Sequence, residues 1–292
     1  MPQHVKMKSK LALGTVQFGI PYGINNTIGI PNQDELNSIF STARLNGIQT
    51  FDTAISYGNA EERIRPVLFE GVHVISKFPN TSTPQSLEQE LNNSLKRLGQ
   101  NNLYAFLAHD ADCLLKQPDL WEELDRLQSD ELIFKKGYSL YYPEQLEKLL
   151  DVGFIPEIVQ VPFNLLDRRF GPAMKKLHEM GVEIHVRSVF LQGLYLMDFT
   201  KLPNILQPIA SELKQLNQIA NSENLSMLAL ALNFAIQNPN IDKVVIGVDS
   251  AEQFQMNLKA INSWDDKKNT IFDKVTQLNC SLPELLIPSN WK

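Results

Sequence analysis

The sequence predicts an α/β fold in which one (β/α)8 TIM barrel spans residues 1–292 as a single domain. Apolar, β-branched runs of about six or seven residues recur eight times along the chain. Helical patterns lie between these runs, and no domain-sized linker interrupts the alternation. Eight strands that alternate with helices favour a closed barrel over a doubly wound sheet.

The predicted strands are short and cover residues 11–16, 47–52, 73–78, 103–109, 133–139, 157–163, 182–188 and 242–248. The helices predicted between them carry apolar side chains along one face, and glycine ends several of them. They cover residues 33–47, 86–99, 143–153, 172–181 and 226–237. In the second of these helices, Ser86 is the expected N-cap and Gly99 follows the last turn.

Three regions are added to the simple alternation. Residues 189–210 follow the seventh strand and are too long for an ordinary turn, so a lid or a binding loop is expected there. An extra helix over residues 250–261 opens after the eighth strand, with Ser250 as its N-cap and a natural phosphate site at its N-terminus. A C-terminal tail, residues 282–292, is expected over the barrel, where Trp291 either lines the mouth or seals it as a surface anchor.

Composition and charge restrict the partners of the chain. The net charge is −6 and the 27 basic residues are dispersed, so neither nucleic acid nor a membrane surface is an expected partner. No apolar run approaches the roughly 20 residues of a transmembrane helix. Cys113 and Cys280 lack metal-ligand spacing, so no metal site is predicted. We expect a cytoplasmic monomer or small homo-oligomer that acts on small molecules.

Four ionisable residues follow the ends of consecutive predicted strands. Asp52 and Tyr57 lie in the segment FDTAISYG. Lys77 and His109 end the next two strands. Because the strand-to-helix loops of a parallel barrel all open on its C-terminal face, we expect these four side chains to converge on one site.

This set of residues suits proton donation to an oxygen that becomes negative. A phenol with an ordinary pKa of about 10 is a weak donor at neutral pH, and a nearby ammonium group would lower that pKa. Lys77 is expected to do so for Tyr57, and Asp52 is expected to keep the lysine charged through an ion pair. His109 can orient a substrate carbonyl by a hydrogen bond. The set therefore predicts reduction of a carbonyl group by hydride.

Several motifs resemble those of the aldo-keto reductase family, over essentially the whole chain. They are GTVQFG (14–19), FDTAISYG (51–58), SKF (76–78), LAHDAD (107–112), QVPFNLLDRR (160–169), RSVFLQGL (187–194) and IGVDSAEQFQMNL (246–258). The resemblance implies a barrel that binds NADPH or NADH in extended form. It also implies a catalytic tetrad of Asp52, Tyr57, Lys77 and His109, with Tyr57 as the general acid.

The resemblance further implies a set of cofactor-binding residues. They are Thr15, Ser139, Gln160, Arg187, Ser188, Gly193, Ser250, Gln253 and Asn257. Ser139 and Gln160 fall where the family holds the nicotinamide carboxamide, and residues 188–193 fall on the loop that spans the pyrophosphate. The last three residues of the set fall where the family grips the adenosine end.

Two residues depart from the family pattern near the nicotinamide. Leu140 stands where a carboxamide ligand is usual, which leaves Ser139 with more of that task. Arg187 stands where many relatives place a tyrosine that stacks on the ring. A guanidinium group can also stack, but its charge opposes the positive charge that the ring gains on oxidation.

The choice between the two dinucleotides depends on the stretch that opens the extra helix. Asp249 would repel a 2'-phosphate, and Gln253 stands where many relatives carry arginine. We therefore expect a weak preference for NADP or outright use of NADH, unless Lys243, Lys259 or a basic residue from another loop reaches the phosphate.

The substrate pocket is expected between the loop after His109, residues 189–210 and the tail. GTVQFGIPYG and RSVFLQGL resemble a bacterial subgroup met in sugar or surface-polysaccharide metabolism, which makes a keto-sugar or sugar aldehyde the expected carbonyl substrate. Two other functions compete with this one. A non-catalytic, cofactor-binding regulatory module is disfavoured by the intact tetrad. A Schiff-base aldolase with Lys77 as nucleophile is disfavoured because Asp52 would keep that lysine charged.

Overall fold

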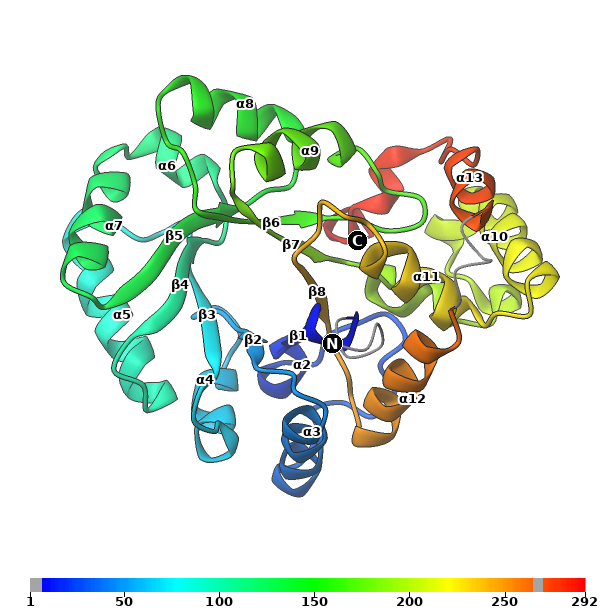
Figure 1. The fold of residues 1–292 in the computed structure, drawn as a ribbon, viewed down its shortest axis with the longest axis horizontal. Helices are drawn as coiled ribbons and strands as arrows, with labels where there is room; N and C mark the ends of the chain where they lie inside the picture. Colours follow the sequence, from blue (N-terminus) through cyan, green and yellow to red (C-terminus); the bar gives the residue numbers. More distant parts are fainter. Residues whose placement is uncertain (1–6, 265–269, 292) are drawn as a thin grey trace.

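The computed structural model describes residues 7–264 and 270–291 of the chain. Eight parallel strands pair in sequence order and close into a barrel, because β1 pairs with both β2 and β8 (Figure 1). The strands are β1 (Leu11–Gly14), β2 (Thr50–Asp52), β3 (His73–Phe78), β4 (Leu103–Ala108), β5 (Ile133–Ser139), β6 (Ile158–Pro162), β7 (Glu183–Arg187) and β8 (Lys243–Ile246). The predicted fold class is confirmed.

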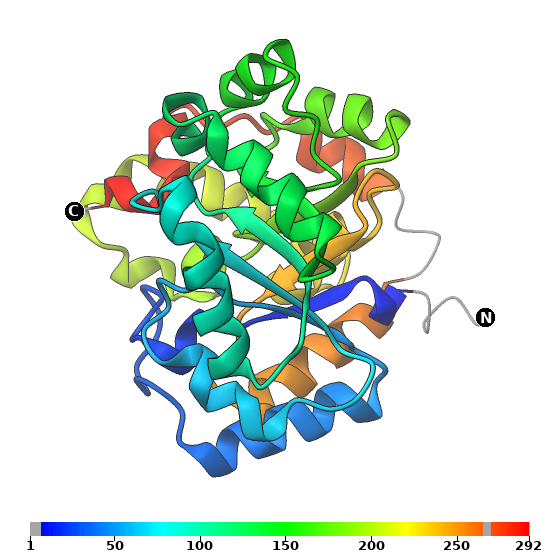
Figure 2. The same cartoon turned by 90° about the vertical axis from the view of Figure 1, so that its left-hand side faces the viewer.

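Helices surround the strands in both views (Figures 1 and 2). The longer ones are α3 (Gln33–Leu45), α5 (Pro84–Leu98), α7 (Asp119–Ser129), α8 (Pro143–Asp151), α9 (Gly171–Glu179), α10 (Ala210–Ser222), α11 (Met227–Ile236) and α12 (Ala251–Asn262). Shorter segments are α2 (Val16–Gly19), α4 (Ala60–Ile64), η1 (Arg65–Val67), α6 (Asp112–Lys116) and α13 (Thr270–Thr276). None of the described helices is long and apolar enough to span a membrane.

The start of α5 differs from the prediction. Thr83 is the N-cap rather than Ser86, because Thr83 Oγ1 accepts from Ser86 N at 3.2 Å. Ser86 Oγ accepts from Thr83 N at 3.0 Å in return, which completes a capping box. Pro84 at the first helical position favours this start, since its ring already has a helical φ. Gly99 ends the helix in the left-handed conformation, as predicted.

Apolar packing on both sides of the strands fixes the strand ends. The larger cluster includes Phe40 of α3 and Phe51 of β2, whose rings stack with their centroids 4.8 Å apart. A smaller cluster of fully buried side chains joins β3, β4 and β6, and consists of Ile75, Ala105, Leu107 and Ile158. Such close packing leaves the residues just beyond the strands little freedom to shift.

The three additions to the alternation take definite conformations. The long segment after β7 contains the 3-10 helices η2 (Leu191–Leu196), η3 (Phe199–Lys201) and η4 (Asn204–Ile209). Ser250 caps α12 as predicted, and its Oγ accepts from Gln253 N at 3.1 Å. The tail forms η6 (Pro283–Leu286) and η7 (Pro288–Asn290), and Trp291 Nε1 donates to Leu285 O at 2.8 Å. The predicted tail reaches Lys292, which lies outside the described residues.

Candidate active site

A buried ion pair lies at the ends of β2 and β3. Lys77 Nζ is 2.7 Å from Asp52 Oδ1, and the side chains are 0% and 5% exposed. Lys77 Nζ also donates to Thr53 O at 2.9 Å, and Gln160 Nε2 donates to Asp52 Oδ1 at 2.8 Å. Burial lowers the pKa of Lys77, while Asp52 opposes that change by favouring the charged ammonium. The predicted pair is therefore present, with Gln160 as a third member.

The ring of His109 lies against the ring of Tyr57. Their centroids are 5.5 Å apart and the planes meet at 80°. Burial lowers the pKa of His109 to about 4, and the nearby charge of Lys77 adds to this effect. His109 is accordingly a neutral imidazole near pH 7, in which one ring nitrogen can donate a hydrogen bond and the other can accept one.

The hydroxyl group of Tyr57 makes no hydrogen bond within residues 7–264 and 270–291. Lys77 Nζ lies over the Tyr57 ring, 5.2 Å from its centroid, because Asp52 and Thr53 hold it there. Burial, and next the charge of Asp52, raise the pKa of Tyr57 well above the ordinary value, and Arg187 opposes them. This direction is opposite to the expected one, because burial has the largest effect on the pKa of the phenol. The phenol is thus fully protonated at neutral pH.

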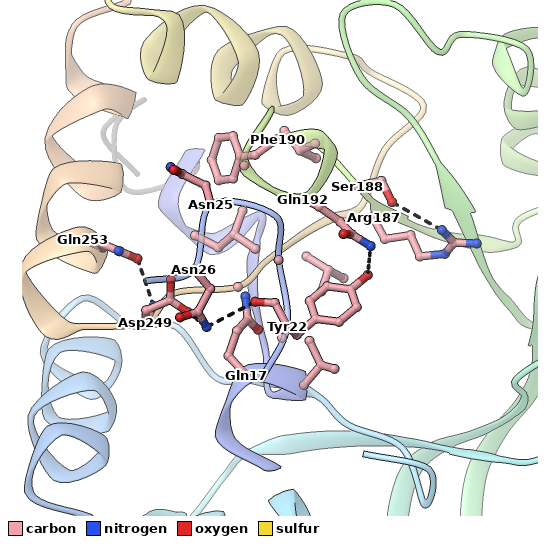
Figure 3. A pocket seen from close by; sticks show the side chains of 18 of the residues that line it. Gln17, Tyr22, Asn25, Asn26, Arg187, Ser188, Phe190, Gln192, Asp249 and Gln253 are labelled. Carbon is pink, nitrogen blue, oxygen red and sulfur yellow. Dashed lines mark hydrogen bonds between the residues drawn. The ribbon is translucent and has the colours of Figure 1, made fainter. Parts of the chain in front are cut away.

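Tyr57 and Asp52 line a cavity of about 280 Å³ at the mouth of the barrel. Figure 3 shows this cavity from close by. Nine residues that the sequence singled out line it: Thr15, Asp52, Tyr57, Gln160, Arg187, Ser188, Gly193, Gln253 and Asn257. The structure therefore gathers most of the predicted set in one cavity. Lys77, His109, Ser139 and Ser250 do not line it. Lys77 and His109 instead lie against Tyr57, while Ser250 uses its side chain to cap α12.

The walls of the cavity differ in part from the expectation. The segment after β7 lines it through residues that include Phe190, Gln192 and Leu196. The loop after His109 and the described part of the tail contribute no lining residue. Their place is taken by the segment after α2, from which Tyr22 to Asn26 line the cavity, Ile24 excepted.

The segment after α2 is a cover that sequence reasoning missed. Tyr22 Oη accepts from Gln192 Nε2 at 3.1 Å, which joins this segment to the one after β7 (Figure 3). Asn26 Nδ2 donates to Asp249 Oδ1 at 3.2 Å, which joins it to the start of α12. The run PYGINN contains the glycine and asparagine that mark a turn, but nothing in it indicates contacts with residues 170 and 223 positions away.

Arg187 occupies the wall beside Tyr57 without a carboxylate partner among the described residues. Its Cζ lies 4.5 Å from the centroid of the Tyr141 ring. Its two terminal nitrogens donate to Leu140 O at 3.1 Å and Ser188 Oγ at 3.3 Å. Leu140 therefore contributes its main-chain carbonyl here, and Arg187 keeps a free guanidinium charge toward the cavity.

Two buried oxygens in the cavity wall lack a hydrogen-bond partner. They are Thr15 Oγ1 and Gln17 Oε1, and Thr15 is fully buried. A buried polar atom left unpaired costs free energy, so such atoms indicate that a polar ligand completes the site. The turn at Gly193, where φ is +89°, adds a main-chain wall that an elongated ligand can approach. These features fit a nicotinamide dinucleotide held by the predicted residues.

A closed parallel barrel with ionisable residues at the ends of its strands defines the class of (β/α)8-barrel enzymes. The sequence pattern of the Aldo/keto reductase family matches residues 10–277, and the chain belongs to this family. Membership implies an oxidoreductase that uses NAD(P)H and a small-molecule carbonyl substrate.

Individual relatives are distant. L-glyceraldehyde 3-phosphate reductase of Escherichia coli (strain K12) is 25% identical over 88% of this chain and 86% of its own. A Schizosaccharomyces pombe protein described as a voltage-gated potassium channel subunit beta is 24% identical over 80% of each chain. The holo structure of an aldo-keto reductase from Bacillus halodurans superposes with a TM-score of 0.73, at 18% identity over 91% of both chains.

Proposed function

We propose that the protein reduces an aldehyde or ketone to an alcohol, with Tyr57 as the proton donor. A nicotinamide cofactor, when bound along the cavity, would supply the hydride that the carbonyl carbon receives. The Tyr57 hydroxyl donates its proton to the carbonyl oxygen as the carbon–oxygen double bond becomes single. The phenolate then regains a proton from solvent. Over one turnover the carbonyl group therefore gains one hydride and one proton, and Tyr57 returns to its protonated form.

The observation that carries this proposal is the free, protonated Tyr57 hydroxyl in the cavity. Burial raises the pKa of Tyr57 and by itself makes the phenol a weaker acid, an effect that the positive charge of Arg187 opposes. The ammonium of Lys77 over the ring then stabilises the phenolate that forms. His109 does not line the cavity, but its neutral ring lies edge-on against Tyr57, and we propose that it hydrogen-bonds the substrate oxygen beside the phenol.

We expect the cofactor to lie along the cavity in the order that the family resemblance implies. Gln160 donates to Asp52 through Nε2, so its Oε1 remains available to accept from the nicotinamide carboxamide. Ser139 lies opposite Gln160 in the neighbouring strand β5 and would bind the same group. Ser188 and Gly193 would face the pyrophosphate, and Asn257 the adenosine end. Ser250 and Gln253 would act at the same end, Ser250 by shaping the start of α12.

A sugar-type carbonyl compound is the proposed substrate class. The motifs GTVQFGIPYG and RSVFLQGL resemble a subgroup met in sugar metabolism, and the relative from Escherichia coli is named for a short phosphorylated aldose. The wall around Tyr57 supplies polar groups for substrate hydroxyls, including Arg187 and Gln192. A panel of sugar aldehydes and keto-sugars, with non-sugar aldehydes of equal size as controls, tests this class by oxidation of NADH or NADPH.

A second candidate function is a cofactor-sensing regulatory subunit, which the channel-subunit relative favours. The two functions differ in turnover. A reductase oxidises many equivalents of cofactor with a carbonyl compound, whereas a sensor binds the cofactor and oxidises at most about one equivalent. The aldolase alternative needs a neutral, unpaired Lys77, and the 2.7 Å contact with Asp52 counts against it. Failure to trap a borohydride adduct on Lys77 would remove it.

A further inference from the structure

We infer that the cavity selects a dinucleotide with a free ribose diol, as in NADH, and that Glu35 and Asp249 exclude a 2'-phosphate. This inference rests on the proposed function, because it names the cofactor of the same site. Thr15 Oγ1, buried and unpaired in the cavity wall, independently indicates a ligand there.

The N-terminus of α12 already carries an anion from another element. The carboxylate of Glu35, on the first turn of α3, accepts a hydrogen bond from Ala251 N. Ser250 Oγ accepts from Gln253 N at 3.1 Å. Two of the first three N–H groups of the helix therefore already have hydrogen-bond partners. The negative charge of Glu35 also lies at the positive end of the helix dipole and partly neutralises it. A phosphate at this end would have to displace Glu35, which differs from the phosphate site that the sequence predicts.

A second carboxylate lies on the cavity side of the same helix end. Asp249 lines the cavity, and Asn26 Nδ2 donates to its Oδ1 at 3.2 Å (Figure 3). Its own N–H donates to Gln253 Oε1 at 2.9 Å, so both the main chain and the side chain of Asp249 are held. The carboxylate of Asp249 is partly buried and has lost part of its hydration, which raises its pKa. Ribose hydroxyls can compensate for that loss, because each can donate a hydrogen bond to the carboxylate.

Neither Glu35 nor Asp249 forms an ion pair within residues 7–264 and 270–291. Among the described residues that line the cavity Arg187 carries the only positive charge, and Figure 3 shows it on the side opposite Asp249. Lys243 Nζ donates to Ser9 O at 2.6 Å, near the start of β1. Lys259 lies in the last turn of α12, about 12 Å along the helix from its first residue. Neither lysine that could have matched a 2'-phosphate is therefore at the site.

The charges decide between the two ligands. A 2'-phosphate carries nearly two negative charges, and it would meet Asp249 with Glu35 behind it. A free 2'-hydroxyl instead donates to a carboxylate in a charge-assisted hydrogen bond. The arrangement consequently weakens the binding of NADPH and strengthens that of NADH.

Isothermal titration calorimetry tests this inference without relying on turnover. The ligands are NADH, NADPH, ADP-ribose and 2'-phospho-ADP-ribose, of which the last two lack nicotinamide. For the unsubstituted protein we expect Kd values at least about tenfold lower for each ligand without the 2'-phosphate. Glu35→Gln, Asp249→Asn and the double variant should progressively remove this difference. Glu252→Gln, which removes an exposed charge from the same first turn, should leave it unchanged.

The outcomes separate this inference from the proposed function. Equal or tighter binding of NADPH by the unsubstituted protein overturns the inference and leaves the proposed function standing. A difference that persists unchanged in the folded double variant also overturns the assignment to Glu35 and Asp249. If none of the four ligands binds, the proposed function and the inference fail together. Thermal unfolding of each variant confirms that it is folded before titration.

Discussion

Replacing Lys77 with methionine removes the cation from the buried pair and leaves Asp52 with Gln160 as its remaining partner. The side chains of the pair are 0% and 5% exposed, so water cannot replace the ammonium group. Breaking a buried pair in this way costs about 3–5 kcal/mol. Because the Gln160 amide still donates at 2.8 Å, we expect the lower end, about 3 kcal/mol of unfolding free energy.

A double-mutant cycle with Asp52→Asn isolates the interaction. Once both charges are gone, the cost of an unpaired buried charge disappears, so Lys77→Met with Asp52→Asn should cost less than the sum by about 1.5 kcal/mol or more. Chemical denaturation at pH 7 measures all four proteins. Lys274→Met is the control, since its pair with Glu223 is 48% and 23% exposed and should contribute under about 1 kcal/mol. Additive effects of the two substitutions would refute the reasoning.

Two further predictions concern pH and packing. In the folded protein the pKa of His109 is lowered from 6.5 to about 4. As the pH falls from 6.5 to 4, His109 therefore takes up a proton in the unfolded chain but not in the folded protein, and up to about 3 kcal/mol of stability is lost. His109→Gln should lose this part of the pH dependence in denaturation curves, and identical curves would contradict it. Gly19→Ala places a methyl group 1.9 Å from Tyr57 O, so it should lower the free energy of unfolding by about 2 kcal/mol and remove most of the activity. Gly171→Ala is the control, because no atom lies within 4 Å of the added methyl group, and it should keep its stability and activity.

The strands and the tetrad were predictable because their signals are local. β3 and β5 coincide with the predicted residues 73–78 and 133–139, where apolar runs end sharply. β2 begins at Thr50 rather than at residue 47, because Gly47 has a φ of +70° and belongs to the turn after α3. The convergence of Asp52 and Lys77 follows from strand order alone in a parallel barrel.

The features that were missed depend on contacts between distant parts of the chain. Glu35 and Ala251 are 216 positions apart, and neither has a local pattern that indicates the other. Asn26 and Asp249 are 223 positions apart, so their hydrogen bond likewise has no local sequence signal. The pKa of Tyr57 was expected to fall, but burial and the charge of Asp52 raise it, and the depth of burial is set by segments that are distant in the sequence.

The most direct test of the account is the Tyr57→Phe variant, with carbonyl reduction and cofactor binding measured side by side. The substitution removes the acidic proton and keeps the ring against His109. We predict that kcat/KM falls by about 100-fold or more, the usual scale for a general acid, while the Kd for the cofactor stays within about twofold. Tyr142→Phe is the matched control, because Tyr142 is 46% exposed and lies outside the cavity wall. Activity of Tyr57→Phe within a few-fold of the unsubstituted protein on several substrates would contradict the assignment of Tyr57 as proton donor.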